Sequence, residues 1–210
     1  AASGRAVEHL LSLGHTRIVH FAGPAYSMHG KERIDGLYRA FSASHIAFPH
    51  EAIVPTGAHM PDGYRVGLQY FRDCSEGERP TAVTCFNDMV ALGLCRALSE
   101  LGLRVPDDVS VVGYDNLPVL DYLSVPLTSV HVPKFEIGEQ AAKILLEHIQ
   151  SHQVIQPQRF QFRAELVVVE IRSRLLQRVV ALLVTALASA PSPVATLFCG
   201  GPLAIPRDRE

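Results

Sequence analysis

The sequence predicts an α/β protein built on a doubly wound parallel sheet. Short apolar runs that favour β-structure alternate with amphipathic helical patterns along the first 130 residues. Glycine and proline separate these segments, as they do at element boundaries. Polar residues follow two neighbouring predicted strands, at Asn87-Asp88 and at Asp115. Because open α/β sheets bind small ligands at the carboxyl ends of their strands, this arrangement indicates a binding site.

The first helix–strand–helix segment is defined by its breakers. Ser3 is expected to cap a helix that ends at Gly14, and a strand is expected over 17–22. Gly23-Pro24 ends that strand and opens a polar loop over 25–30. The apolar residues of the first helix are Val7, Leu10 and Leu11, and those of the second, which recur at i, i+3, i+4 and i+7, are Ile34, Leu37, Tyr38 and Phe41.

The next predicted strand and helix follow the second helix. Residues 52–54 form a predicted strand, and Pro61 begins a helix, as proline does at a first helical position. The inward residues of this helix are expected to be Tyr64, Leu68 and Phe71.

The segment over 80–116 is the most informative part of the chain. A strand is predicted over 81–86, a helix over 88–101 and a second strand over 109–112. Asn87 or Asp88 is suited to cap the helix, while Gly102 and Pro106 end it. The loop Gly113-Tyr114-Asp115-Asn116 leaves the carboxyl end of the second strand.

The pattern shifts near Pro126. A strand is predicted over 127–130 and a helix over 133–149. Apolar residues then alternate from Phe160 to Val168, which is typical of a half-buried strand or pair of strands.

The last 39 residues, 172–210, form an atypical tail. Val179–Ala190 is apolar but spans 12 residues, whereas a membrane-spanning helix needs about 20. Several prolines follow and prevent a regular continuation. The tail is compatible with an extra helix, with a segment that does not pack specifically, or with a membrane-surface segment.

Composition excludes several classes of protein. With 48% hydrophobic and 19% charged residues the chain is globular, and its net charge of −2 offers no basic surplus for binding DNA through these residues alone. None of the four cysteines forms a CxxC pair, which is typical of free thiols in a reducing compartment. The ten histidines show no metal-ligand spacing, so no metal site is expected.

Catalytic motifs are also missing from the sequence. It contains no GxSxG elbow, no Walker glycine loop and no GxGxxG after a strand. Asp107-Asp108 is a paired acid, but Pro106 and the following strand place it in a surface turn. We therefore expect a binding protein rather than an enzyme, without a cofactor.

An ordered set of short motifs resembles one known family. The densest are Asn87-Asp88, Ala91-Leu92-Gly93 and the string from Val105 to Asp115, VPDDVSVVGYD. Further matches are Leu13–Ile18, Ala22-Gly23-Pro24, Arg33–Leu37, Pro80-Thr81-Ala82, Gly102, Pro126–Val130 and Gly138. Over roughly residues 3–169 the chain resembles the effector-binding core of the lactose-repressor (LacI/GalR) family of transcription regulators.

The resemblance implies a periplasmic-binding-protein-like sensor of two subdomains, incomplete here. Residues 1–126 would be most of the C-terminal subdomain, and 127–155 a crossover segment of an N-terminal subdomain whose other strands are absent. Residues 156–171 would be the returning strand. The chain starts Ala1-Ala2-Ser3-Gly4, without an initiator Met or a signal peptide, so we expect a fragment whose beginning is missing.

The resemblance also implies which residues contact a ligand. It places Asp115, Asn87 and Arg33 at the ligand, whereas the residues alone also allow a turn-stabilising Asp, a helix cap and a surface arginine. Tyr26 or Phe86 is suited to stack on a sugar or a base, although core or rim packing fits each equally well. The remaining loop candidates are Ser27, His29, His59 and Met60, and Asp88 is expected to be structural.

The expected function is the sensor part of a ligand-responsive, DNA-binding transcription regulator. The effector is expected to be sugar-like or nucleoside-like, the regulator a cytoplasmic homodimer, and operator DNA to be bound by a helix-turn-helix absent from this chain. No membrane partner is expected. The alternative is a periplasmic sugar-binding protein of a transporter, which shares the fold.

Overall fold

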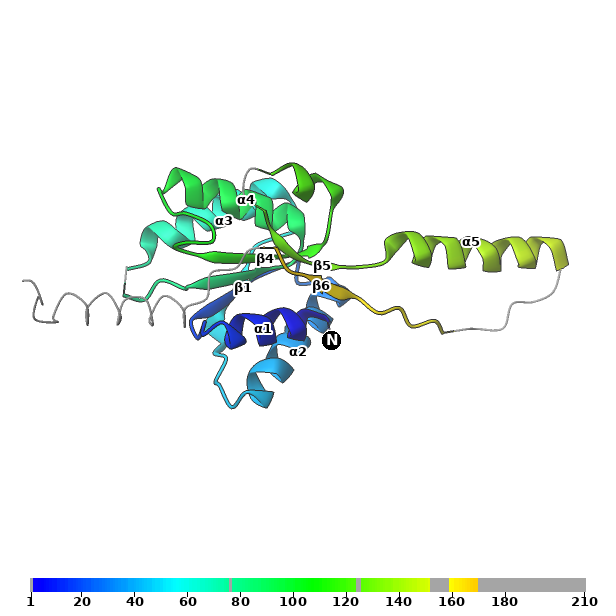
Figure 1. Ribbon diagram of the computed structural model, residues 1–210, viewed down its shortest axis with the longest axis horizontal. Coiled ribbons are helices and arrows are strands. Elements are labelled where there is room, and N and C mark those ends of the chain that lie inside the picture. The colour runs from blue at the N-terminus through cyan, green and yellow to red at the C-terminus, as the bar shows by residue number, and fades with distance from the viewer. Residues whose placement is uncertain (1, 76, 124–125, 152–158, 170–210) are drawn as a thin grey trace, which may run out of the picture. The chain divides into compact units, whose positions relative to one another are not determined.

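A computed structural model describes residues 2–75, 77–123, 126–151 and 159–169 of the chain. The helices are α1 (Ala2–Ser12), α2 (Met28–Ala43), α3 (Met60–Asp73), α4 (Asp88–Glu100) and α5 (Lys134–Ser151), with short 3-10 turns at His50–Ala52 and Pro118–Tyr122. The strands are β1 (Ile18–Ala22), β2 (Ile53–Pro55), β3 (Ala82–Cys85), β4 (Ser110–Asp115), β5 (Thr128–His131) and β6 (Glu165–Val167) (Figure 1).

The six strands form one sheet in the order β2-β1-β3-β4-β5-β6. The first five strands are parallel, and β6 runs antiparallel to β5. The chain winds outward from β1 in both directions, so the strand order reverses between β1 and β3. The predicted doubly wound α/β sheet is confirmed.

Helices cover both faces of the sheet. In Figure 1, α1 and α2 lie on one face, and α3 and α4 lie on the other. The strand residues alternate between two cores. Phe21, Val83 and Val111 pack with α3 and α4, whereas Ile18, Ala82 and Val112 pack with α1 and α2. Because both faces are covered, β1 and β3 are buried along their whole length rather than at alternate residues.

Capping residues place the helix starts at the carboxyl edge of the sheet. The Ser27 side chain accepts a hydrogen bond from the Gly30 amide at the start of α2. The Asn87 side chain accepts one from the Val90 amide at the start of α4, which settles the choice between Asn87 and Asp88 as the cap. At the other end of α4, Gly102 has the positive φ of 72° typical of a C′ glycine.

Several local predictions need correction. Ser3 lies inside α1, and its buried hydroxyl donates a hydrogen bond to the Arg33 carbonyl instead of capping the helix. The polar loop after β1 ends at Ser27, so His29 and Gly30 belong to α2. Ala52 closes a 3-10 turn, and the strand runs over Ile53–Pro55.

The alternating pattern from Phe160 to Val168 overstates the last strand. Only Glu165–Val167 pairs with β5, and Phe160 and Phe162 lie outside it with 45% and 37% of their surface exposed. The predicted tail over 172–210 lies outside the described residues. Thr128–His131 pairs with β4, so this sheet continues beyond the expected subdomain boundary at residue 126.

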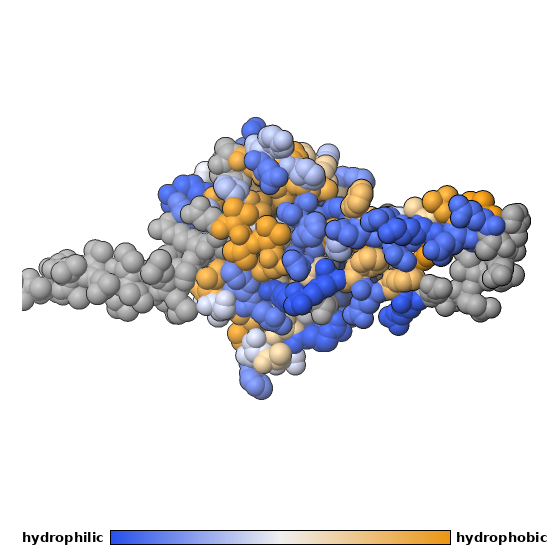
Figure 2. All heavy atoms as spheres, turned by 45° about the vertical axis from the view of Figure 1, so that its right-hand side comes forward, coloured by the Kyte–Doolittle hydropathy of each residue, from blue (hydrophilic) through white to orange (hydrophobic). Residues whose placement is uncertain are grey.

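Helix α5 has no buried side chain among its described residues. Its exposed apolar residues include Phe135, Leu145, Leu146 and Ile149, each more than half exposed. Figure 2 shows hydrophobic and polar residues together on its surface. Among the described helices, none is long and apolar enough to cross a membrane.

Candidate functional site

The candidate site lies at the carboxyl edge of the sheet, where α2 faces the end of β4. Arg33 projects from α2, and Asp115 is the last residue of β4. The Arg33 Nη2 atom lies 3.7 Å from the Asp115 Oδ1 atom, and the two side chains are 15% and 30% exposed. The structure therefore brings together two residues that are 82 positions apart and were predicted separately.

The Arg33 guanidinium is fixed by two aromatic rings. Its central carbon lies 3.8 Å from the centre of the Tyr114 ring and 4.5 Å from that of the Phe86 ring. Cations are attracted to aromatic faces at such distances. The Arg33 Nη1 atom also donates a hydrogen bond to the Phe86 carbonyl. These contacts hold the guanidinium in one place beside Asp115.

Burial acts on both charged groups of this pair. It lowers the pKa of Arg33, against the opposing effect of the Asp115 carboxylate, and an arginine remains a cation. Burial also raises the pKa of Asp115, while the charges of Arg33, Lys134 and His29 lower it. The pair is thus partly withdrawn from water, a setting in which hydrogen bonds to charged groups are strong.

A hollow of about 1010 Å³ opens in front of this pair. It is lined by α1, α2, the end of β4, Val132 and the segment 161–164. Arg33 and Asp115 line it together with Tyr114, and His29 stands at the first turn of α2. Its volume is of the size that holds small molecules.

Several residues that line this hollow were not predicted from the sequence. Arg5 and Glu8 come from the outer face of α1, and Phe162 and Arg163 come from the segment before β6. The Arg5 guanidinium donates a hydrogen bond to the Ala164 carbonyl, which ties these two elements together. Three-residue spacing marks Arg5 and Glu8 as one helix face, but only the tertiary structure shows that this face borders the hollow.

The other predicted ligand residues do not line this hollow. The Phe86 ring is 9% exposed and lies over Gly23, where a side chain would overlap it. Both ends of the Asn87 amide are engaged, by the Val90 amide and by the Ala58 carbonyl. Tyr26 is 87% exposed on the loop after β1. Their ligand contacts stay predictions.

The remaining loop candidates are also placed. Ser27 is the cap of α2, and His59 is the N-terminal residue before α3, where its amide donates a hydrogen bond to the Asp62 carboxylate. Met60 begins α3 and is 40% exposed. None of the three lines the hollow in front of Arg33.

Asp88 is the buried member of the Asn87-Asp88 pair. It has no exposed surface, and its carboxylate accepts hydrogen bonds from the Ser129 hydroxyl and the Leu117 amide. Burial raises its pKa, and these two hydrogen bonds lower it. The expected structural role of Asp88 therefore has specific partners.

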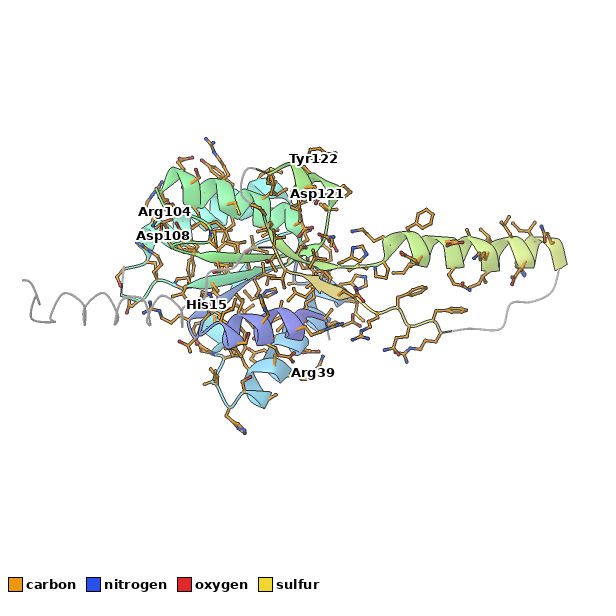
Figure 3. All side chains as sticks on the ribbon, viewed as in Figure 1. His15, Arg39, Arg104, Asp108, Asp121 and Tyr122 are labelled. Carbon is orange, nitrogen blue, oxygen red and sulfur yellow. The ribbon has the colours of Figure 1, made fainter. Side chains whose placement is uncertain are left out.

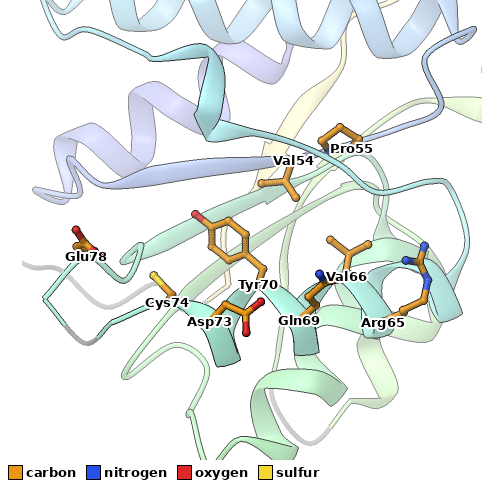
Figure 4. Close-up of a pocket in the computed structure, with 9 residues that line it drawn as sticks. All are labelled: Val54, Pro55, Arg65, Val66, Gln69, Tyr70, Asp73, Cys74 and Glu78. Atoms are coloured by element: carbon orange, nitrogen blue, oxygen red, sulfur yellow. The ribbon is translucent and has the colours of Figure 1, made fainter.

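A second hollow of about 520 Å³ lies between β2 and α3 (Figure 4). Its lining includes the apolar residues Val54 and Val66, the Tyr70 ring and the charged residues Arg65 and Asp73. No residue that the sequence analysis selected lies there. Among the described residues, no group of three or more His, Cys, Asp or Glu side chains is placed to hold a metal ion.

Comparisons with known proteins identify relatives of most of this chain. Residues 7–170 match the family described as periplasmic binding protein-like domain. The HTH-type transcriptional repressor PurR of Vibrio vulnificus is 40% identical over 144 residues, which are 69% of this chain and 42% of the relative. The chain thus spans less than half the length of the curated relatives that it matches.

Solved structures agree with this match. A complex of the transcriptional regulator CelR with cellobiose is 28% identical, with a TM-score of 0.70 over 82% of this chain and 51% of that one. The lac repressor dimer bound to operator and the anti-inducer ONPF is 34% identical, with a TM-score of 0.63 over 72% of this chain and 51% of that one. These relatives are transcription regulators rather than enzymes. The chain belongs to the periplasmic binding protein-like domain family, in the form shared by lactose-repressor-type regulators.

Proposed function

We propose that this chain is the sensor part of a ligand-responsive transcription regulator. The observation that carries the proposal is the Arg33–Asp115 pair, held at 3.7 Å on the wall of a large hollow at the carboxyl ends of the strands. A charged pair at such an edge offers both donors and acceptors to a ligand. The relatives named above are regulators, which favours a sensor over a transporter component.

The chemistry of the pair favours a small ligand rich in hydroxyl or ring N–H groups. Arg33 carries five N–H donors in a rigid fork, and the Asp115 carboxylate accepts two hydrogens at once. Sugars satisfy both groups through neighbouring hydroxyls, and purine bases through a carbonyl beside a ring N–H. Phe162, which is 37% exposed in the hollow, offers an aromatic face for either class.

The exposed surfaces support an incomplete two-subdomain sensor. We assign the sheet through His131, together with β6, to one subdomain, and the segment from Val132 through α5 to a second subdomain. The apolar side chains exposed on α5 would be covered by the rest of that second subdomain. A ligand that binds the closed arrangement more tightly would shift the population toward it.

This shift would be passed to DNA in the intact regulator. We propose a cytoplasmic homodimer that binds operator DNA through a helix-turn-helix outside this chain, because paired reading heads are reoriented when a dimer changes shape. The side chain of Tyr122, labelled in Figure 3, is 87% exposed and would be available for a contact with a second copy. Val119, in the same 3-10 turn, is 47% exposed. No catalytic step and no cofactor is part of this proposal.

A ligand screen with charge-matched variants tests the proposal. D-ribose, cellobiose, hypoxanthine, guanine and adenosine are each added to the chain while its thermal unfolding is followed. A member of the panel is expected to raise the midpoint, since binding to the folded state stabilises it. Asp115→Ala and Arg33→Ala are expected to remove that rise.

The matched control is the exposed pair Arg104–Asp108, whose side chains approach to 3.1 Å in a surface turn (Figure 3). Arg104→Ala is expected to keep the full ligand-induced rise. A rise that survives in both Asp115→Ala and Arg33→Ala would place the ligand elsewhere and defeat the proposal.

A further inference from the structure

We infer that Asp88 and Ser129 are positioning residues, which hold the turn over 115–117 so that the Asp115 carboxylate faces Arg33 and the hollow. The inference deepens the proposed function and rests on it for the ligand, but the hold on the turn stands on the structure alone. Neither residue lines the hollow, so both act through Asp115.

The two side chains bind two consecutive backbone amides of one turn. Ser129 Oγ accepts from the Asn116 amide at 3.1 Å, and Asp88 Oδ2 accepts from the Leu117 amide at 2.8 Å. The Ser129 hydroxyl in turn donates to Asp88 Oδ1 at 2.6 Å. Both hydrogen bonds of Ser129 can form at once. Its hydroxyl hydrogen is donated to Asp88, and a lone pair of its oxygen accepts the Asn116 amide hydrogen.

The turn that they hold has an unusual backbone. Asp115 has a φ of 106° and Asn116 has a φ of 48°, although neither is glycine. Such conformations are costly for residues with a side chain and persist when the surroundings impose them. Lys134 adds a third restraint by donating from Nζ to the Asp115 carbonyl. The surroundings therefore determine where the Asp115 side chain points.

Gly113 makes room for this arrangement. A Cβ atom at this position would overlap Asp88 Oδ1 and come within 3.4 Å of Ser129 Oγ. Only glycine lets the buried carboxylate approach β4 this closely. Each residue of the segment 113–115 thus has its own role. Gly113 leaves room for Asp88, the Tyr114 ring packs against Arg33, and Asp115 supplies the carboxylate that faces Arg33.

The same contacts link the site to the chain that leaves the sheet. Ser129 lies on β5, and the described chain runs from the end of β5 at His131 into α5. Asn116 Nδ2 also lies 3.4 Å from His131 Nδ1. A movement of β5 or of the segment after it would therefore change the position of Asp115, because hydrogen bonds connect β5 to the turn that carries it.

Hydrogen exchange measured by NMR on the full 210-residue chain tests the hold on the turn without any ligand. Ser129→Val and Ser129→Thr have nearly the same volume and differ in the hydroxyl. In Ser129→Val the Asn116 amide is expected to exchange about tenfold faster than in Ser129→Thr, the effect of losing one hydrogen bond. Ser110→Ala is the control, because it removes a buried hydroxyl at the opposite end of β4, where Ser110 contacts His15. Equal Asn116 exchange in the valine and threonine variants would overturn the inference.

Calorimetric titration with hypoxanthine and with D-ribose tests the effect on the ligand. For the probe that binds the wild type, Ser129→Val is expected to weaken binding about tenfold, while Ser129→Thr and Ser110→Ala retain it. Unchanged binding in Ser129→Val would overturn the positioning role even if exchange is faster. If the wild type binds neither probe, the ligand class of the proposed function fails, and the exchange result alone decides whether Ser129 holds the turn.

Discussion

At the scale of single residues, His20 is the most unusual group near the site. Its ring is buried on β1 and lines a small internal space with Arg33 and Tyr114. Nδ1 bonds to Thr84, whereas Nε2 has no hydrogen-bond partner in the described part of the chain. A protonated ring would carry a buried N–H without an acceptor, close to a guanidinium.

His20 should make the protein sensitive to acid. Burial lowers the pKa of His20 from 6.5 to about 4, the Thr84 carbonyl raises it, and the Arg33 charge lowers it further. Between pH 6.5 and about 4, His20 is therefore protonated in the unfolded chain but neutral in the folded chain. Because the unfolded chain binds the extra proton, the free energy of unfolding falls as the pH drops through this range. From pH 7 to pH 5 the loss from this group amounts to about 2 kcal/mol.

Urea unfolding at pH 7 and pH 5 measures this effect against His20→Asn, which keeps a donor near Thr84 but does not titrate. The wild type should lose about 2 kcal/mol more than the variant over this interval. Parallel losses in the two proteins would show that His20 is not held neutral by the fold.

At the residue scale, the position of a side chain could be predicted from the sequence where that position depends on its neighbours in the chain. The cap at Asn87 and the surface turn at Asp107-Asp108 follow from neighbouring residues, and each lies where it was expected. Asp115 was expected in a loop after a strand over 109–112, but it is the last residue of β4. By contrast, the Phe86 ring packs against the Arg33 guanidinium, and the Asn87 amide donates a hydrogen bond to the Ala58 carbonyl. No local pattern in the sequence shows that these side chains already have these partners.

At the scale of elements, α5 differs from the four other described helices. Each of α1 to α4 buries a face against the sheet or a neighbouring helix, whereas α5 has no buried side chain among those described. Most helical stability in proteins comes from packing of an apolar face. The apolar residues of α5 therefore add little to the stability of this chain.

A pair of identical substitutions tests this difference. Leu145 is 56% exposed on α5, and Leu98 is fully buried on α4. Leu145→Ala is expected to change the free energy of unfolding by less than about 0.5 kcal/mol, whereas Leu98→Ala should cost about 2–5 kcal/mol. A loss at Leu145 as large as at Leu98, measured by urea unfolding, would mean that α5 packs within this chain.

Element boundaries show the limits of periodicity. The helical spacing of Ile34, Leu37 and Phe41 and the apolar run at β3 were sufficient, because both faces of the sheet are covered. The alternation from Phe160 to Val168 also satisfied the strand pattern, but pairing stops outside Glu165–Val167. Periodicity reports which side chains could share a face, whereas pairing depends on a neighbouring strand of matching length, and β5 has four residues.

At the scale of the whole molecule, the sheet topology favours the hollow beside Arg33 over the hollow between β2 and α3. The order β2-β1-β3-β4-β5 reverses beside β1, and Arg33 and Asp115 meet at the carboxyl edge next to this reversal. The hollow between β2 and α3 lies at the outer edge of the sheet and has no such charged pair fixed by aromatic rings. The sequence could predict the edge, but the size and lining of the hollow depend on α1 and on the segment 161–164, which meet only in the folded chain.

The central claim is that a small ligand binds at the Arg33–Asp115 pair. Titration of the isotopically labelled chain with D-ribose and with hypoxanthine, followed by NMR, tests it directly by locating each contact. The claim predicts that the Arg33 side-chain N–H signals and the amides of Asp115 and Asn116 shift in a saturable manner, while those of Gln69 and Tyr70 in the β2–α3 hollow stay constant. Saturable shifts confined to Gln69 and Tyr70, with Arg33 and Asp115 unmoved, would contradict it.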